Sequence, residues 1–352
     1  MRRSSRRSTR RTGVGRRGTR RTSLGRTGLG AAGGALTALG AASVLAFAWG
    51  SLIERNWYAL REVSVPALEP GAAPIRVLHI SDLHMAPWQR GKQEWIRSLA
   101  ALNPDLIVDT GDNLGHERGL EGVEYALEPF RGIPGVFVNG SNDYFGPTPK
   151  NPMKYFSGPS LNHRKPASLD IAGLTEFFTG LGWLDLNNAA GELTVNGTRL
   201  ELFGVDDPHR RFDRLDLLPA ILDDLREQDE TDATWPDDET APASPSLSIG
   251  VTHAPYQRVL NTFVTYGARM IFAGHTHGGQ VCVPGYGALV TNCDIPRKQV
   301  KGLSMWPHAL RTAYLNVSAG VGTSIYAPVR FACRPEATLL TLTPSVPTAV
   351  VE

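Results

Sequence analysis

Five short polar clusters, each placed directly after an apolar stretch, constrain this chain more than any other feature. The apolar stretches are consistent with buried strands at residues 75–80, 105–110, 135–139, 247–252 and 269–273. The clusters that follow them are Asp82-Leu83-His84, Gly111-Asp112-Asn113, Gly140-Ser141-Asn142-Asp143, His253 and Gly274-His275-Thr276-His277-Gly278-Gly279. In open α/β sheets ligands bind at the carboxyl ends of strands, so the clusters predict one shared site.

The spacing of the apolar stretches indicates the fold class. Helix-like segments at 93–102 and 119–130 separate the first three strands, and this alternation is typical of a parallel or mixed sheet covered by helices. Further strands are predicted at 200–205, 313–317 and 337–342, with a helix at 215–226. The chain is therefore expected to be an α/β protein.

The cluster His275-Thr276-His277, flanked by glycines, is the most specific of the five. Alternate residues of an extended segment point the same way, and glycines allow close approach of the backbone. A single histidine at a strand end is more often simply hydrogen-bonded than a metal ligand. Five such clusters in this order are hard to explain by chance and favour a metal site.

The order of the clusters resembles that of the calcineurin-like metallophosphoesterases. The resemblance spans residues 75–342 and is closest to a bacterial branch of membrane-associated or twin-arginine-exported phosphoesterases. Three segments carry this branch's pattern: residues 274–280, 203–208 and 320–324. The family resemblance implies a four-layer α/β/β/α sandwich with two facing mixed sheets.

The resemblance also implies the ligands of two metal ions. Metal one would take Asp82, His84, Asp112 and His277, and metal two Asp112, Asn142, His253 and His275. Asp112 would bridge them, as a carboxylate can hold two cations about 3.5–4 Å apart. Imidazole and oxygen ligands together suit Mn, Fe, Zn or Co. A hydroxide bridging the metals would then attack the phosphorus atom.

The third cluster departs from the family pattern Gly-Asn-His-Asp/Glu. Counting from the preceding strand places Asn142 on the ligand Asn and Asp143 on the catalytic His, while aligning on Gly140 places Ser141 and Asn142 there. The first alignment keeps a ligand and is preferred, which makes Asp112, Asn142 and Asp143 the candidate catalytic residues. Asp143 could donate a proton only if its pKa were raised.

The N-terminal segment differs in composition from the rest. Residues 1–26 hold eleven arginines and no acid, so the remaining residues carry a net charge of −9 within a total of +2. Such a tail is expected to be disordered. Residues 27–53 contain no charged side chain and are long enough to cross a membrane. The positive-inside rule then places the catalytic domain on the extracytoplasmic side of the cell membrane.

Two alternatives for this segment stay open. Residues 19–24 resemble a twin-arginine export signal, and residues 46–48 offer a cleavage site. The tail could also bind nucleic acid or anionic lipid, although nucleic acid is an unlikely main partner.

The remaining residues divide into a linker and a large domain. Residues 54–74 are expected to be a linker and 75–345 the phosphoesterase domain, with loop insertions at 144–170 and 223–245. The basic residues of the first loop either meet the substrate or are solvated. Three cysteines do not describe a disulfide framework; either Cys282 and Cys293 pair, or all three are thiols.

These observations predict a two-metal hydrolase of phosphomonoesters or phosphodiesters, lipid-linked ones included, tethered to the membrane by residues 27–53. The alternative is a non-catalytic metal-binding scaffold, because the histidine of the third motif is missing.

Overall fold

A computed structural model describes residues 26–147, 166–232 and 246–345 of the chain. The chain divides into two compact units, Met1–Leu45 and Ala46–Glu352. Helix α1 (Arg26–Ala48) crosses the boundary between the units and is followed by a π-helical turn (Trp49–Ile53) and a 3-10 turn (Glu54–Asn56). The following paragraphs concern the second unit.

Two six-stranded mixed sheets form the centre of the described part of this unit. The first has the order β1-β14-β2-β3-β4-β5 and the second β12-β13-β9-β8-β7-β6. The first sheet contains β1 (Ala59–Leu68), β14 (Glu336–Pro344), β2 (Ile75–Ile80), β3 (Leu106–Asp109), β4 (Gly135–Phe137) and β5 (Trp183–Asp185). The second contains β12 (Gly302–His308), β13 (Arg311–Val317), β9 (Met270–Ala273), β8 (Ser246–Thr252), β7 (Thr198–Val205) and β6 (Ala189–Val195).

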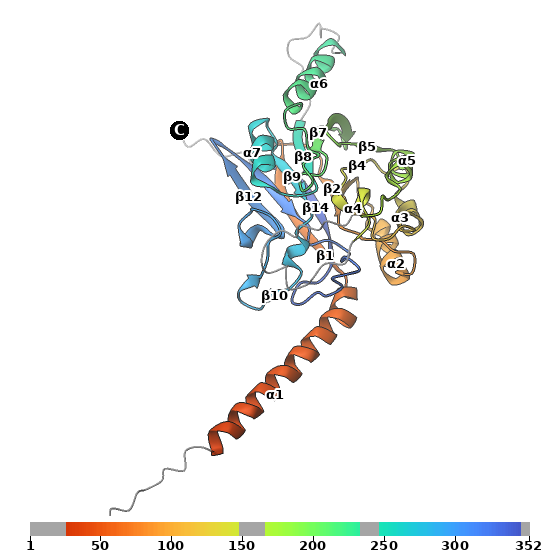
Figure 1. Cartoon of the computed structure of the whole chain (residues 1–352). Helices are drawn as coiled ribbons and strands as arrows, with labels where there is room; N and C mark the ends of the chain where they lie inside the picture. The colour runs from red at the N-terminus through yellow and green to blue at the C-terminus, as the bar shows by residue number, and fades with distance from the viewer. Residues whose placement is uncertain (1–25, 148–165, 233–245, 346–352) are drawn as a thin grey trace, which may run out of the picture. The chain divides into compact units, whose positions relative to one another are not determined.

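Helices cover the outer face of each sheet (Figure 1). The first sheet packs against α2 (Arg90–Ser98), α3 (Leu120–Leu127) and α5 (Ile171–Leu181). The second packs against α6 (Leu218–Asp232) and α7 (Gln257–Thr265). Shorter elements of the described residues include helix α4 (Ser141–Tyr144) and a hairpin of β10 (Cys282–Val283) and β11 (Gly287–Ala288).

Three clusters of buried apolar side chains lie between the layers of the sandwich: one between each sheet and its helices, and one between the two sheets. Alternate residues of a strand point to opposite faces, so in β2 the side chain of Leu78 joins the helix-side core and that of Val77 the core between the sheets. The inter-sheet core also contains Val108, Ile249 and Phe272. Burial on both faces explains why these strands consist mainly of apolar residues. The predicted α/β/β/α sandwich is confirmed.

The linker prediction for residues 54–74 is wrong in one part. Residues 59–68 form β1, which pairs in parallel with β14. Arg61 and Glu62 are exposed on this edge strand, and Pro66 is tolerated there, so the stretch lacks the apolar pattern of a central strand. Its partner lies about 275 residues further along the chain, and Arg61 pairs with Glu336 at 2.8 Å.

The two expected loop insertions are described only in part. Residues 148–165 and 233–245 lie outside the described residues, and the basic side chains of the first insertion lie among them. The start of the second is wrong as a loop, because α6 continues to Asp232. All three cysteines are free; Cys282 and Cys333 are buried, and Cys293 is partly exposed, so the Cys282–Cys293 bridge is not formed.

Replacing Phe178 by Ala tests the helix-side core of the first sheet. Phe178 is fully buried and stacks on Trp183 at 5.2 Å between ring centroids. We expect the free energy of unfolding to fall by about 3–5 kcal/mol, because the truncation leaves a cavity. Urea denaturation measures the loss. Phe177→Ala, at the partly buried neighbouring position, should cost clearly less, and equal losses would contradict this packing.

Candidate dinuclear metal site

The five predicted clusters meet at one end of the sandwich. Asp82, Asp112 and Asn142 follow strands of the first sheet, while His253 and His275 follow strands of the second. The two sheets are packed with the carboxyl ends of these strands at the same edge. Loops that are distant in sequence therefore converge there.

The first half of the site contains Asp82, His84, Asp112 and His277. Nε2 of His84 lies 3.1 Å from Nε2 of His277 and 3.6 Å from Oδ2 of Asp112. Nε2 of His277 lies 3.5 Å from Oδ1 of Asp82. Ligand atoms of Asp82, His84 and His277 all lie within 4.8 Å of one another.

The second half shares Asp112 with the first. Oδ1 of Asp112 lies 3.5 Å from Nε2 of His253, which in turn lies 3.2 Å from Nδ1 of His275. The Asn142 amide lies 2.7 Å from Oδ2 of Asp112. The carboxylate of Asp112 thus stands between the two groups of ligands.

The donor set fits a pair of divalent cations. Oδ2 of Asp82 accepts hydrogen bonds from Ser81 Oγ and from the N–H group of His275, whereas Oδ1 is buried with no hydrogen-bond partner among the described residues. That oxygen lies 3.5 Å from Nε2 of His277. Imidazole nitrogens and carboxylate oxygens that converge in this way match the ligands of Mn, Fe, Zn or Co.

Five of the proposed ligands have a strained backbone conformation. Left-handed backbone conformations, which side chains other than Gly seldom adopt, occur at Asp82, His84, Asp112, His275 and His277, with φ between 40° and 67°. Such strain persists only where the surrounding structure over-determines it, and it clusters at functional sites.

Two glycines leave the room that the ligands occupy. A Cβ atom at Gly140 would collide with Oδ1 of Asp112 and lie 2.7 Å from His253. A Cβ atom at Gly274 would collide with Ser81 Oγ and lie 2.8 Å from Oδ2 of Asp82. Both glycines are therefore required by close packing.

Groups behind the ligands fix their orientation. Nδ1 of His253 lies 2.7 Å from the carbonyl oxygen of Thr110, which leaves Nε2 to face Asp112. Lys92, buried on α2, donates to the carbonyl oxygens of Leu83 and His84. Neither partner was expected from the sequence, because a carbonyl contact leaves no motif.

Burial and neighbouring charges shift the pKa values of Asp82 and Asp112 in opposite directions. Burial raises the pKa of Asp82 to about 6. Burial also acts to raise the pKa of Asp112, but the neighbouring His253 and His84 outweigh it and hold that pKa well below its ordinary value. A buried anion at Asp112 is the charge that a bridging ligand requires.

Asp143 does not face the ligands. Its carboxylate is fully buried and accepts hydrogen bonds from the backbone N–H groups of Asp112, Asn113, Leu114 and Gly140. Burial raises its pKa to about 8, yet both oxygens are engaged with backbone donors. We therefore replace the catalytic interpretation of Asp143 with a structural one, in which it holds the Asp112 loop.

Asn142 is the residue of the third cluster whose side chain reaches the carboxylate of Asp112. The Ser141 hydroxyl instead donates to the buried carboxylate of Asp207. The Asn142 amide nitrogen donates to Oδ2 of Asp112, and its role as a metal ligand stays a prediction.

His209 is a site residue that the sequence analysis missed. Its ring centroid lies 4.6 Å from that of His275, and its Nδ1 lies 2.9 Å from the hydroxyl group of Tyr256. His209 is exposed, whereas His275 is buried, so His209 lies at the solvent side of the ligands. It follows the 203–208 segment directly, which was noted only as part of a family pattern.

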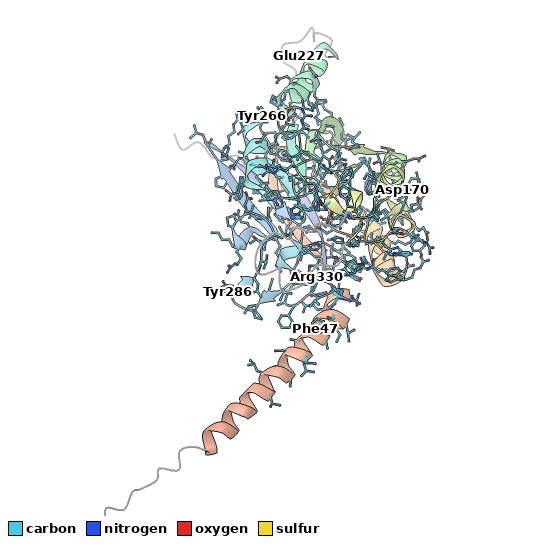
Figure 2. The ribbon with its side chains drawn as sticks, in the orientation of Figure 1. Phe47, Asp170, Glu227, Tyr266, Tyr286 and Arg330 are labelled. Atoms are coloured by element: carbon cyan, nitrogen blue, oxygen red, sulfur yellow. The ribbon has the colours of Figure 1, made fainter. Side chains whose placement is uncertain are left out.

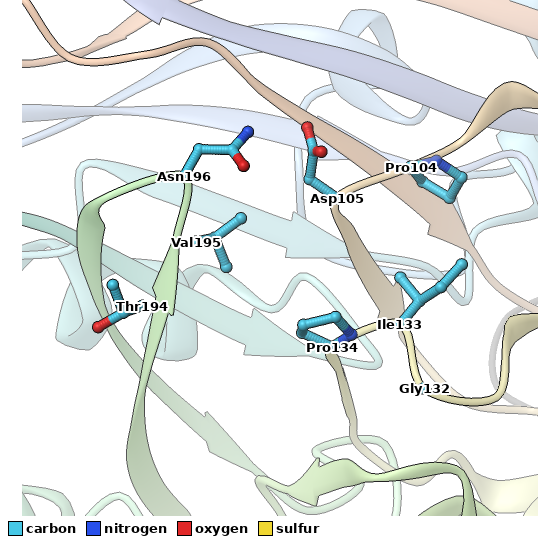
Figure 3. A pocket seen from close by; sticks show the side chains of 8 residues that line it. All are labelled: Pro104, Asp105, Gly132, Ile133, Pro134, Thr194, Val195 and Asn196. Atoms are coloured by element: carbon cyan, nitrogen blue, oxygen red, sulfur yellow. The ribbon is translucent and has the colours of Figure 1, made fainter.

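A separate hollow lies at the other ends of the strands. Its lining includes Pro104 and Asp105 before β3, Pro134 before β4 and Asn196 in the β6–β7 turn (Figure 3). Asp105 is the acidic residue in this lining, and it accepts a hydrogen bond from the N–H group of Arg76. This hollow is not part of the metal site.

Comparison with known proteins agrees with this geometry. A family model described as calcineurin-like phosphoesterase matches residues 75–279. The uncharacterized protein YpbG of Bacillus subtilis (strain 168) is 26% identical, over 77% of this chain and 82% of its own length. The uncharacterized metallophosphoesterase YkuE of the same organism is 24% identical, over 83% and 86%. The phosphodiesterase YaeI of Escherichia coli (strain K12) is 24% identical, over 84% and 92%.

Replacing Asp143 by Asn tests its structural role. One acceptor oxygen becomes an NH₂ group that faces backbone N–H groups, and we expect the free energy of unfolding to fall by about 1–3 kcal/mol. Asp216→Asn, on the exposed surface, should leave stability unchanged.

Activity on aryl phosphates with good and poor leaving groups should fall by the same factor in Asp143→Asn. A loss confined to the poor leaving group would restore Asp143 as a proton donor.

Proposed function

We propose that this chain, which belongs to the calcineurin-like phosphoesterase family, is a two-metal hydrolase of phosphoesters. The observation that carries the proposal is the position of the Asp112 carboxylate between His84 and His253, with one oxygen toward each. Metal one would be held by Asp82, His84, Asp112 and His277, and metal two by Asp112, Asn142, His253 and His275. Two divalent cations supply the activated water and the positive charge that phosphoester hydrolysis needs.

The residues of the chain have distinct parts in this proposal. Asp112 and the four histidines hold the cations, and Asn142 closes the second site next to Asp112. His253 is kept in the tautomer that leaves Nε2 available by the carbonyl oxygen of Thr110. Lys92 and Asp143 keep the two aspartate-bearing loops in register from behind.

His209 takes the place of the missing histidine of the third motif in this proposal. It projects from the second sheet on the solvent side of His275, and Tyr256 orients its ring through a hydrogen bond at Nδ1. A phosphoryl oxygen bound beside metal two would meet the imidazole of His209. The presence of this imidazole supports a catalytic protein over the alternative of a non-catalytic scaffold.

We favour phosphodiesters over phosphomonoesters as substrates. Among the relatives, the Escherichia coli protein is named a phosphodiesterase. The basic side chains that could contact a second phosphate substituent lie outside the described residues, so this preference rests on the relative alone.

We also propose that the catalytic domain is tethered on the extracytoplasmic side of the cell membrane, as in a membrane-associated branch of the family. Within the described residues, Thr37–Asn56 is a helical stretch long and apolar enough to span a bilayer, a test that a signal sequence also passes. The arginine-rich residues 1–26 precede it and favour the cytoplasm. Detection of residues 27–53 in the purified membrane protein would separate an anchor from a cleaved twin-arginine signal.

Asp112→Asn tests the metal centre. We expect hydrolysis of a generic aryl phosphodiester with added Mn²⁺ to fall at least about a hundred-fold, because a bridging anion supplies several kcal/mol. Metal analysis of the purified protein should show less bound metal. Asp216→Asn is the control. Full activity of Asp112→Asn, or wild-type protein that binds no divalent metal, would refute the proposal.

His209→Ala tests the proposed substrate contact. We expect kcat to fall about 10²-fold, as for loss of one donor to a phosphoryl oxygen, while the bound metal content is unchanged. Tyr256→Phe should give a smaller loss, since it removes only the group that orients the ring. His308→Ala, on the distant strand β12, should be neutral. A His209→Ala enzyme with wild-type kcat would exclude this role.

A further inference from the structure

Exposed apolar side chains gather around three segments that are separate in sequence. We call residues 46–57, 281–289 and 326–334 the rim. The large hydrophobic residues exposed in it are Phe47, Trp49, Leu52, Ile53, Trp57, Val283, Tyr286, Leu289 and Tyr326. Exposed apolar residues scattered singly are ordinary, but a contiguous patch indicates a surface that contacts something.

Hydrogen bonds show that the three segments are contiguous. The N–H group of Arg330 donates to the carbonyl oxygen of Gly50 at 3.1 Å, and the N–H group of Cys333 donates to the carboxylate of Glu54 at 2.7 Å. Phe331 exchanges backbone hydrogen bonds with Gln280 and Cys282, where the hairpin β10–β11 begins. Figure 2 shows Phe47, Arg330 and Tyr286 toward one end of the domain.

A basic cavity opens beside the hairpin. Arg297, Lys298 and Lys301 line it together with residues of the rim, and no acidic side chain is in its lining among the described residues. The Arg297 guanidinium lies over the Tyr286 ring, 4.5 Å from its centroid. The rim therefore combines apolar tips with adjacent cations.

We propose that the rim lies on the surface of a bilayer that contains anionic phospholipid, with a headgroup phosphate in the basic cavity. Two observations favour a membrane over a protein partner. The first segment of the rim contains the end of Thr37–Asn56, the candidate membrane span, so the other two segments lie next to the residues that leave the bilayer. Aromatic side chains beside cations are the composition that membrane interfaces select.

The rim also adjoins the metal site. Gly278 lines the basic cavity and directly follows His277, and the carbonyl oxygen of His277 lies against the Cys333 thiol, at 3.4 Å. Contact with a bilayer at the rim would bring phosphate-bearing headgroups close to the cations. This step rests on the proposed function and makes membrane phosphoesters the substrate class.

Photo-crosslinking of the full chain tests the proposal. Tyr286 is replaced by benzoylphenylalanine, and the protein is reconstituted in phosphatidylcholine vesicles with or without phosphatidylglycerol. The matched control carries the same replacement at Tyr125, an exposed tyrosine of α3. We expect lipid adducts at position 286 several-fold above those at position 125, and more of them with phosphatidylglycerol.

Charge reversal separates the basic cavity from simple proximity to the anchor. Arg297→Glu combined with Lys298→Glu should abolish the gain from phosphatidylglycerol while hydrolysis of a soluble aryl phosphodiester is retained. Adducts at 286 no more frequent than at 125, or adducts to protein rather than lipid, would overturn the proposal. Cross-linking does not depend on hydrolysis, so a failure here is distinct from a failure of the phosphoesterase assignment.

Discussion

The shared position of the Asp112 carboxylate is the constraint on which the site depends. One oxygen faces His84 and the other faces His253, and these histidines are carried by different sheets. The sheets must therefore pack with the carboxyl ends of their strands at a common edge. The inter-sheet core, which includes Val77, Val108 and Phe272, fixes that packing. The apolar interior and the polar edge are thus two consequences of one arrangement.

Bringing buried carboxylates and imidazoles together is energetically unfavourable, and nearby hydrogen bonds compensate part of this cost. Backbone strain at five of the proposed ligands is supported by hydrogen bonds from behind, of which those of Asp143 are the most numerous around the Asp112 loop. Burial of these groups is unfavourable unless cations or donors compensate their charge. In the proposed function the departure at the third motif is compensated by His209, an imidazole from another strand end that lies 4.6 Å from His275 between ring centroids.

The rim suggests how substrate access and tethering are related. Segments from the end of the candidate span, the β10–β11 hairpin and the 326–334 loop are joined by backbone hydrogen bonds. The last of these segments contacts His277 through Cys333 and Arg330. A molecule bound at the rim would therefore lie close to His277, one of the proposed ligands. Tethering would place the site near its substrate as well as retain the protein at the membrane.

The sequence alone determined where along the chain the central strands and the polar clusters after them occur, since apolar runs and turn residues are local signals. The strand at 75–80 and the clusters around Asp112 and His275 were predictable for this reason. Strand β1 was not, because its pairing with β14 joins residues about 275 positions apart and its charged residues face outward. Tertiary structure alone decided that Asp143 turns away from the ligands and that His209 turns toward them. Side-chain direction there depends on left-handed loops and on contacts between sheets, which no local pattern records.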